Sequence, residues 1–176
     1  MLGAWPTILS ASRRKTISKR SPTSTTRQSS AAARPPTPRT YAQRKAWVES
    51  HHDPYAVFVT TVPATDAATE GGERIIGFSA LSVFYDRAGY DGVTDLAYYI
   101  APEWQGRGAG TFTLAKLLDE CRNRHMRKAC GIIFADNRGS IALMKHFGFT
   151  QFGLMPQAAT DSTGTMRDMS YWHLDL

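Results

Sequence analysis

The chain has 176 residues, of which 42% are hydrophobic, and a formal net charge of +6. This length fits one folded domain with a tail, and no apolar run approaches the roughly 20 residues that span a bilayer, so a soluble protein is expected. Residues 1–45 hold 10 of the 21 Lys and Arg and none of the 15 acids, which leaves residues 46–176 with a net charge of −4. The folded part therefore gives no electrostatic reason to expect nucleic-acid binding.

Residues 1–40 are rich in Ser, Thr, Arg, Pro and Ala and have few large apolar residues after Leu9. Such a segment cannot bury enough apolar surface to fold, so we predict a disordered basic tail over 1–40 and one folded domain over 41–176. An acid-free N-terminus rich in Arg and Ser is also typical of mitochondrial transit peptides. A cytoplasmic protein is expected, with a mitochondrial location as the alternative.

The first half of the domain is predicted to contain one helix and three strands. Residues 41–50 form the helix, and Pro54 prevents its continuation. Runs of β-branched and aromatic residues predict strands over 55–62, 73–84 and 93–100, with 63–72 as the turn between the first two. A second helix is predicted from 111 to about 124, because its apolar residues recur at helical spacing: Leu114, Leu117, Leu118 and Cys121.

The second half is predicted to add a strand over 128–135, a turn over 136–139 and a short helix over 140–146 that Gly148 ends. Residues 150–154 and 166–174 form a final antiparallel pair around a turn at 161–164. The two cysteines, Cys121 and Cys130, make neither a disulfide framework nor a zinc-binding spacing. We expect both to pack as small apolar residues, and we expect no metal site.

A glycine-rich stretch, Gln105-Gly106-Arg107-Gly108-Ala109-Gly110, lies between the strand at 93–100 and the helix at 111–124. A strand, glycine turn and helix in this order direct backbone N–H groups and the positive end of the helix dipole at one point, which suits a phosphate. The stretch lacks the lysine of the common nucleotide phosphate loop, and Thr111 replaces the last glycine of the dinucleotide fingerprint. By itself the stretch also fits an ordinary glycine-rich turn that caps a helix.

Three motifs in order resemble the GCN5-related N-acetyltransferase (GNAT) family over about residues 41–176. The first is the Gln-x-x-Gly-x-Gly spacing from Gln105 to Gly110, and the second is Asn137-Arg138-Gly139-Ser140 leading to Phe147-Gly148-Phe149. The third is the strand segment Ile76-Gly77-Phe78-Ser79. The resemblance implies an α/β fold with a mixed, mostly antiparallel central sheet flanked by helices, and acetyl-CoA as the acetyl donor.

Within the family the chain is similar to the phosphinothricin acetyltransferases. The segments that carry this likeness are Trp47-Val48-Glu49, Pro54-Tyr55, Thr94–Ile100 and Arg167–Trp172. The likeness implies a small amino-acid-like amine as the acceptor and a homodimer. The alternatives are another amine or a protein N-terminus as acceptor, and a CoA-binding pseudoenzyme.

Two departures from the family pattern motivate these alternatives. The family begins with a strand and two helices that help to build the acceptor pocket, whereas residues 1–40 show no such pattern, so the N-terminal module is expected to be incomplete. Seven residues after the family's asparagine, where many members carry a proton-donating tyrosine or histidine, this chain has Met144.

The resemblance also implies roles for individual residues. Backbone groups of Gln105, Gly106, Arg107, Gly108, Ala109 and Gly110 would hold the pyrophosphate of acetyl-CoA. Tyr98, Tyr99 and Ile100 would lie along the pantetheine as a neighbouring strand does, and Asn137 and Ser140 would contact it from the second helix.

Asp95 is the candidate base. An aliphatic amine is mostly protonated at pH 7, so a carboxylate must take or relay its proton before acetyl transfer. Asp95 matches the glutamate of the subfamily, and an acid on an apolar strand is costly without a partner or a role. The alternative is an exposed acid at the end of the strand. Among the histidines, His51 and His52 fit a loop cap or a surface role, while His173 could reach the pocket from the last strand.

Overall fold

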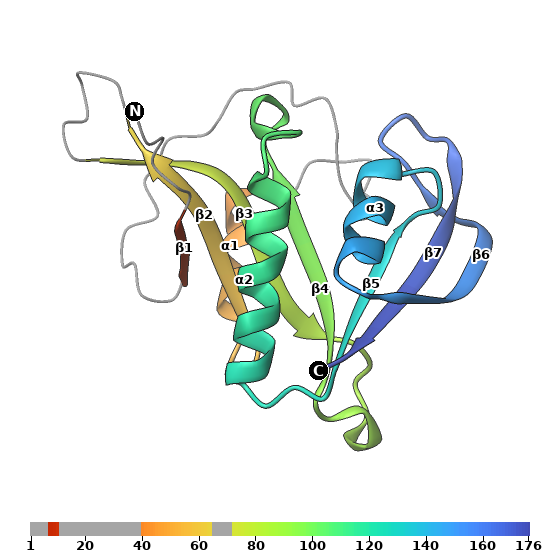
Figure 1. Cartoon of the computed structure of the whole chain (residues 1–176). Coiled ribbons are helices and arrows are strands. Elements are labelled where there is room, and N and C mark those ends of the chain that lie inside the picture. The colour runs from red at the N-terminus through yellow and green to blue at the C-terminus, as the bar shows by residue number, and fades with distance from the viewer. Residues whose placement is uncertain (1–6, 11–39, 65–71) are drawn as a thin grey trace.

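The structure, a computed structural model, describes residues 7–10, 40–64 and 72–176 (Figure 1). The strands are β1 (Thr7–Ser10), β2 (Ala56–Pro63), β3 (Glu73–Val83), β4 (Val93–Ile100), β5 (Lys128–Phe134), β6 (Thr150–Thr160) and β7 (Met166–Asp175). The helices are α1 (Tyr41–Glu49), α2 (Ala109–Asn123) and α3 (Arg138–His146), with 3-10 turns over Ala88–Tyr90 and Pro102–Trp104. None of these helices is long and apolar enough to cross a membrane.

The described strands form a single sheet in the order β1-β2-β3-β4-β5-β7-β6. All neighbouring pairs are antiparallel except β4 and β5, which are parallel. The predicted mixed, mostly antiparallel sheet is therefore confirmed. The predicted element order from residue 41 onward is also confirmed, because each element is marked by a local pattern of apolar residues and by a proline or glycine at its end.

Two segments differ from the prediction. Thr7–Ser10 pairs antiparallel with β2, so these four residues form a strand within the predicted disordered tail, at the edge of β2 that β3 leaves open. The rest of the predicted tail, apart from Thr40, lies outside the described residues, as does most of the turn at 63–72. β6 continues to Thr160, beyond the predicted end at residue 154, because its pairing with β7 resumes at Ala159 after an irregular stretch.

The helices cover the two faces of the sheet unequally. Figure 1 shows α2 and α3 on the near face and α1 behind β2 and β3. The near face holds the main core, in which Leu114, Leu117 and Leu118 of α2 are at most 2% exposed. α1 begins at Tyr41 because Thr40 and Gln43 form a reciprocal capping box, and it has no fully buried residue. The face under α1 is therefore the more thinly covered side of the sheet.

Candidate active site

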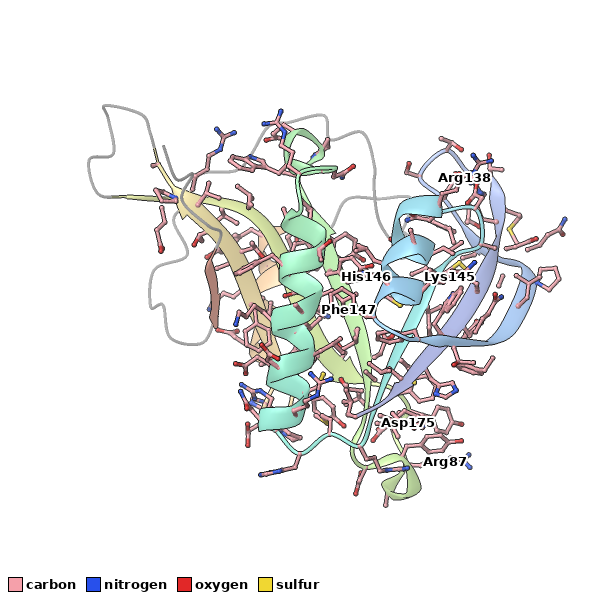
Figure 2. The ribbon with its side chains drawn as sticks, viewed as in Figure 1. Arg87, Arg138, Lys145, His146, Phe147 and Asp175 are labelled. Atoms are coloured by element: carbon pink, nitrogen blue, oxygen red, sulfur yellow. The ribbon has the colours of Figure 1, made fainter. Side chains whose placement is uncertain are left out.

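The parallel strands β4 and β5 separate in the middle of the sheet. Only Val93, Thr94 and Asp95 have register partners in β5, and Figure 1 shows the two strands diverging beyond this point. The N-termini of α2 and α3 both lie at the end where the strands are apart; Figure 2 labels Arg138 at this end of α3. An extended ligand can pair with the edge of a strand in this way, as peptides do when they add to a sheet.

The predicted phosphate loop connects β4 to α2. Gly106 and Gly108 have φ of 68° and 83°, and a β carbon at either position would meet no atom within 4 Å. Their backbone conformation, rather than crowding, therefore selects glycine. Gly108 is the N-cap of α2, so the N–H groups of the first helical turn stay available to a ligand. Gln105 anchors the loop, because its Nε2 donates to the carbonyl oxygen of Ile100 at 2.9 Å.

The end of the loop has a packing role that the sequence did not indicate. A β carbon on Gly110 would lie 3.2 Å from Leu143 Cδ1, so this glycine permits the close approach of α2 and α3. Ala109 is 3% exposed and joins a small apolar cluster with Ile100 and Trp104. Arg107 is exposed. The first part of the motif thus presents backbone to a ligand, and the last part holds the helices together.

Asn137 and Ser140 lie at the start of α3. The side-chain oxygen of Asn137 caps the helix by accepting from the Ser140 N–H at 3.0 Å. Ser140 is buried beside the Tyr98 hydroxyl, which has no partner at full hydrogen-bond geometry in the described chain and only a looser polar contact with the Ser140 side chain. Burial raises the pKa of Tyr98, opposed by this neighbouring serine. A buried hydroxyl without a well-placed partner is rare in folded proteins. The Tyr98 hydroxyl lies on the face of β4 at which α3 begins.

Tyr98 and Tyr99 point to opposite faces of the sheet, as their alternation predicts. Tyr98 is 5% exposed and lies in the main core. Tyr99 stacks on Phe78 with ring centroids 4.5 Å apart, and Phe78 meets Trp47 of α1 edge-on at 6.3 Å. The sheet face under α1 therefore carries an aromatic cluster, defined by Trp47, Phe78 and Tyr99.

Asp95 stands on the same face as this aromatic cluster, at the last position where β4 pairs with β5. Its side chain is half-buried, and its Oδ1 is fully buried with no hydrogen-bond partner among the described residues. The alternative of an exposed acid at the strand end is therefore wrong. Removal from water disfavours the carboxylate and raises the pKa of Asp95 to about 7. A carboxyl group with such a pKa can both take and release a proton near neutrality.

The thiol of Cys130, which lies beside Asp95, lacks the properties of a catalytic nucleophile. Cys130 is the register partner of Asp95 on β5 and is 3% exposed. Burial, followed by the charge of Asp95, raises the pKa of Cys130 to about 11, so the thiol stays protonated at neutral pH. Both cysteines are free and buried, which confirms the predicted packing role.

The histidines separate into different roles. His52 and His146 are exposed, and His173 Nδ1 lies 3.3 Å from Lys128 Nζ on the face that also carries Asp95. His51 caps the end of α1, as expected for a loop cap, since its Nδ1 lies 2.7 Å from the Trp47 carbonyl oxygen. Sequence reasoning missed its second contact, with Ser82 Oγ at 3.0 Å, because 31 residues separate the two and no local pattern connects them.

Met144 is fully buried against Gly131, with its sulfur 3.3 Å from the position that a β carbon of Gly131 would occupy. The position from which many family members donate a proton is thus part of the core in this chain.

Comparisons with known proteins agree with this geometry. The model of the acetyltransferase (GNAT) family matches residues 24–149. An L-methionine sulfoximine/L-methionine sulfone acetyltransferase of Pseudomonas aeruginosa is 27% identical over 141 residues, which cover 80% of this chain and 77% of that protein. A phosphinothricin N-acetyltransferase of Streptomyces coelicolor is 30% identical over 118 residues, covering 66% and 65% of the two chains.

Among solved structures, an acetyltransferase from Salmonella typhimurium with its cofactor acetyl-CoA superimposes with a TM-score of 0.65. It is 27% identical, and the match covers 77% of this chain and 73% of that one. The glycine loop, the separated strands and the unpaired Tyr98 hydroxyl all fit a ligand of this kind at the start of α2 and α3. The chain therefore belongs to the GNAT acetyltransferase family, and it is an acyltransferase that uses acetyl-CoA.

Proposed function

We propose that this protein transfers the acetyl group of acetyl-CoA to the amino group of a small amino-acid-like compound of the phosphinothricin type. The names of the relatives support this acceptor class, because they include acetyltransferases for phosphinothricin and for methionine sulfoximine. The observation that carries the proposal is the half-buried Asp95 carboxyl group with its unpaired oxygen. It lies beside the point where β4 leaves β5, which is where we place the substrate amine.

Different residues of the chain contact the acetyl donor and the acceptor. The pyrophosphate is held by backbone groups of the loop that runs from Gln105 through Gly106, Arg107, Gly108 and Ala109 to Gly110. Tyr98, Tyr99 and Ile100 offer the edge of β4 to the pantetheine, which Asn137 and Ser140 approach from α3. Acetyl-CoA supplies an activated thioester, and the backbone N–H groups near Ile100 stabilise the negative charge that develops on its carbonyl oxygen.

Asp95 acts on the acceptor as the base. It takes one proton from the substrate ammonium and leaves a neutral amine that can attack the thioester. The aromatic cluster of Trp47, Phe78 and Tyr99 shares this face of the sheet and provides an apolar surface for the acceptor's side chain. The buried thiol of Cys130 takes no part, so the acetyl group moves directly from donor to acceptor.

A thiol-release screen tests the acceptor class. The full chain is incubated with acetyl-CoA and one acceptor at a time: phosphinothricin, methionine sulfoximine, methionine sulfone, free amino acids, polyamines and a peptide with a free N-terminus. We expect release with the amino-acid-like compounds and little with polyamines. Preferential release with the peptide would replace the proposed acceptor class by a protein N-terminus.

A CoA-binding pseudoenzyme is the second candidate, and the core position of Met144 favours it. Measurable binding of CoA by calorimetry without thiol release for any acceptor is the result that would establish it. In an active enzyme, Asp95→Asn is expected to lower kcat by about 10²-fold or more, in the range of general-base contributions. Its affinity for CoA is expected to stay unchanged, as is the rate of the matched surface variant Asp119→Asn.

We also propose a homodimer that forms through β6, which lies at one edge of the described sheet. Phe152, Leu154 and Met155 of this strand are each at least 51% exposed. An apolar edge strand of this kind favours pairing with another chain. Light scattering is expected to give twice the chain mass, and Leu154→Lys is expected to yield monomers. A monomeric wild-type protein at micromolar concentration would contradict the proposal.

A further inference from the structure

A histidine at the end of α1 connects a surface cavity to the surroundings of Asp95. His51 Nε2 lies 3.0 Å from Ser82 Oγ on β3. Ser82 is the register partner of Asp95, so the two side chains stand side by side on the sheet face under α1. The β carbons of such a pair are about 5 Å apart. Because Asp95 Oδ1 has no hydrogen-bond partner in the described chain, a proton passes between the two side chains only through a bound amine or water molecule, or after the carboxyl group turns toward Ser82.

The hydrogen bonds of the imidazole fix which nitrogen carries the hydrogen. His51 Nδ1 lies 2.7 Å from the Trp47 carbonyl oxygen. A carbonyl oxygen only accepts, so Nδ1 is the donor. In the neutral ring Nε2 is then an acceptor, and the Ser82 hydroxyl donates to it. The imidazole is therefore prepared to receive a proton from the side of Ser82.

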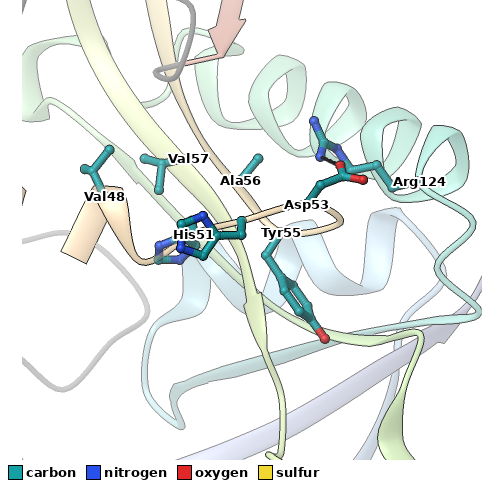
Figure 3. A pocket seen from close by; sticks show the side chains of 8 residues that line it. Val48, His51, Asp53, Tyr55, Ala56, Val57 and Arg124 are labelled. Carbon is teal, nitrogen blue, oxygen red and sulfur yellow. Dashed lines mark hydrogen bonds and ion pairs between the residues drawn. The ribbon is translucent and has the colours of Figure 1, made fainter. Parts of the chain in front are cut away.

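The opposite side of His51 faces solvent. His51 borders a cavity of about 300 Å³, and Figure 3 shows the side chains around it. The cavity is lined by Val48, His51, His52, Asp53, Tyr55, Ala56, Val57 and Arg124. The charges in this cavity already have partners, because Arg124 Nη1 donates to Asp53 Oδ1 at 2.9 Å and Arg124 Nε to Glu120 Oε2 at 3.2 Å. The cavity thus gives His51 access to water without presenting it with an unpaired charge.

Several titratable groups surround the row formed by His51, Ser82 and Asp95. On the side of the cavity these are His52, Asp53, Tyr55 and Arg124. On the side of the sheet, Cys130 is the other register partner of Asp95, and His173 follows on β7, where Lys128 contacts both His173 and Asp175. Among the described groups that contact Ser82, only His51 also borders the cavity.

We propose that His51, acting through the Ser82 hydroxyl, carries the proton that Asp95 takes from the acceptor amine to the water of the cavity. The acceptor ammonium protonates the Asp95 carboxylate. The carboxyl group then passes a proton to Ser82 Oγ, directly or through one water molecule, while the hydroxyl hydrogen of Ser82 moves to His51 Nε2. His51 turns toward the cavity as an imidazolium and releases the proton to water, which leaves Asp95 ready for the next acceptor.

This inference rests on Asp95 being the base of the proposed acetyl transfer. The test uses the full chain with acetyl-CoA and whichever acceptor gives thiol release. We expect His51→Gln and Ser82→Ala each to lower kcat by about tenfold, below the range of a direct general base, with KM for both substrates unchanged. The double variant is expected to be no slower than either single one, because both act on one step. His52→Gln, which changes an exposed histidine of the same cavity, serves as the control and keeps the wild-type rate.

Two measurements separate a proton relay from a structural role. Free imidazole, at constant pH and ionic strength, is expected to restore the rate of His51→Ala in proportion to its concentration. Nitrogen NMR is expected to show the Nδ1–H tautomer of His51 in the wild-type protein. The relay is wrong if both single variants keep the wild-type kcat, or if imidazole leaves the rate of His51→Ala unchanged. A slow Asp95→Asn beside a fast His51→Gln refutes the relay alone, whereas a fast Asp95→Asn refutes the base and the relay together.

Discussion

The burial of Asp95 predicts that its replacement by asparagine changes how the stability of the fold depends on pH. In the folded protein, burial raises the pKa of this carboxyl group to about 7, while an unfolded chain has an aspartate pKa near 3.9. The folded state binds this proton more tightly. The stability contributed by the neutral carboxyl group is therefore fully present below about pH 4 and is lost as the pH rises through about 7.

The magnitude follows from the difference between the two pKa values. Each pH unit between the two pKa values corresponds to about 1.4 kcal/mol, so raising the pH from 5 to 8 costs the wild-type protein about 2.5 kcal/mol through this group. Asp95→Asn has no such proton to lose. The difference in unfolding free energy between variant and wild type is therefore expected to shift in favour of the variant by about 2.5 kcal/mol between pH 5 and pH 8.

Urea unfolding at pH 5 and pH 8, followed by circular dichroism, measures this shift. Comparing each protein with itself at two pH values cancels the intrinsic difference between a carboxyl group and an amide. Asp119→Asn on the exposed surface of α2 is the control and is expected to show a shift near zero. A shift below about 0.5 kcal/mol for Asp95→Asn would show that the carboxyl group is solvated in the folded protein, and would remove the argument for a base with a pKa near 7.

Four further predictions concern the donor site and the thiol. Tyr98→Phe is expected to raise the unfolding free energy by about 1 kcal/mol, since its buried hydroxyl is unpaired, and to weaken CoA binding in calorimetry; a loss of stability would contradict this. Gly108→Ala is expected to lower the urea midpoint, because alanine in this left-handed backbone conformation costs about 1 kcal/mol of unfolding free energy. The exposed control Gly89→Ala is expected to leave the midpoint unchanged. Cys130→Ala is expected to keep kcat, because the thiol stays protonated; a large loss would support a covalent route. Asn137→Ala is expected to cost about 1 kcal/mol through the lost cap, and Asn137→Asp to recover most of that stability in the same assay.

The sequence alone indicated most of the elements and the donor. Strands and helices from residue 41 onward follow local apolar periodicity, and prolines and glycines mark their ends. The spacing from Gln105 to Gly110, together with the family resemblance, predicted a phosphate loop, and positive φ at Gly106 and Gly108 is the local backbone requirement that selects glycine there. The strand Thr7–Ser10 escaped prediction because four residues carry little pattern, and their pairing depends on the open edge of β2.

The tertiary structure decided how the chemistry-bearing side chains are surrounded. Sequence indicated Asp95 as an acid on an apolar strand, but its burial, and with it the raised pKa, depends on how β3, β4 and β5 meet around it. The contact between His51 and Ser82 joins residues 31 positions apart, and Gly110 proved to be a contact between two helices. Local patterns fix backbone conformation, whereas pKa, burial and proton pathways depend on neighbours that only the folded chain brings together.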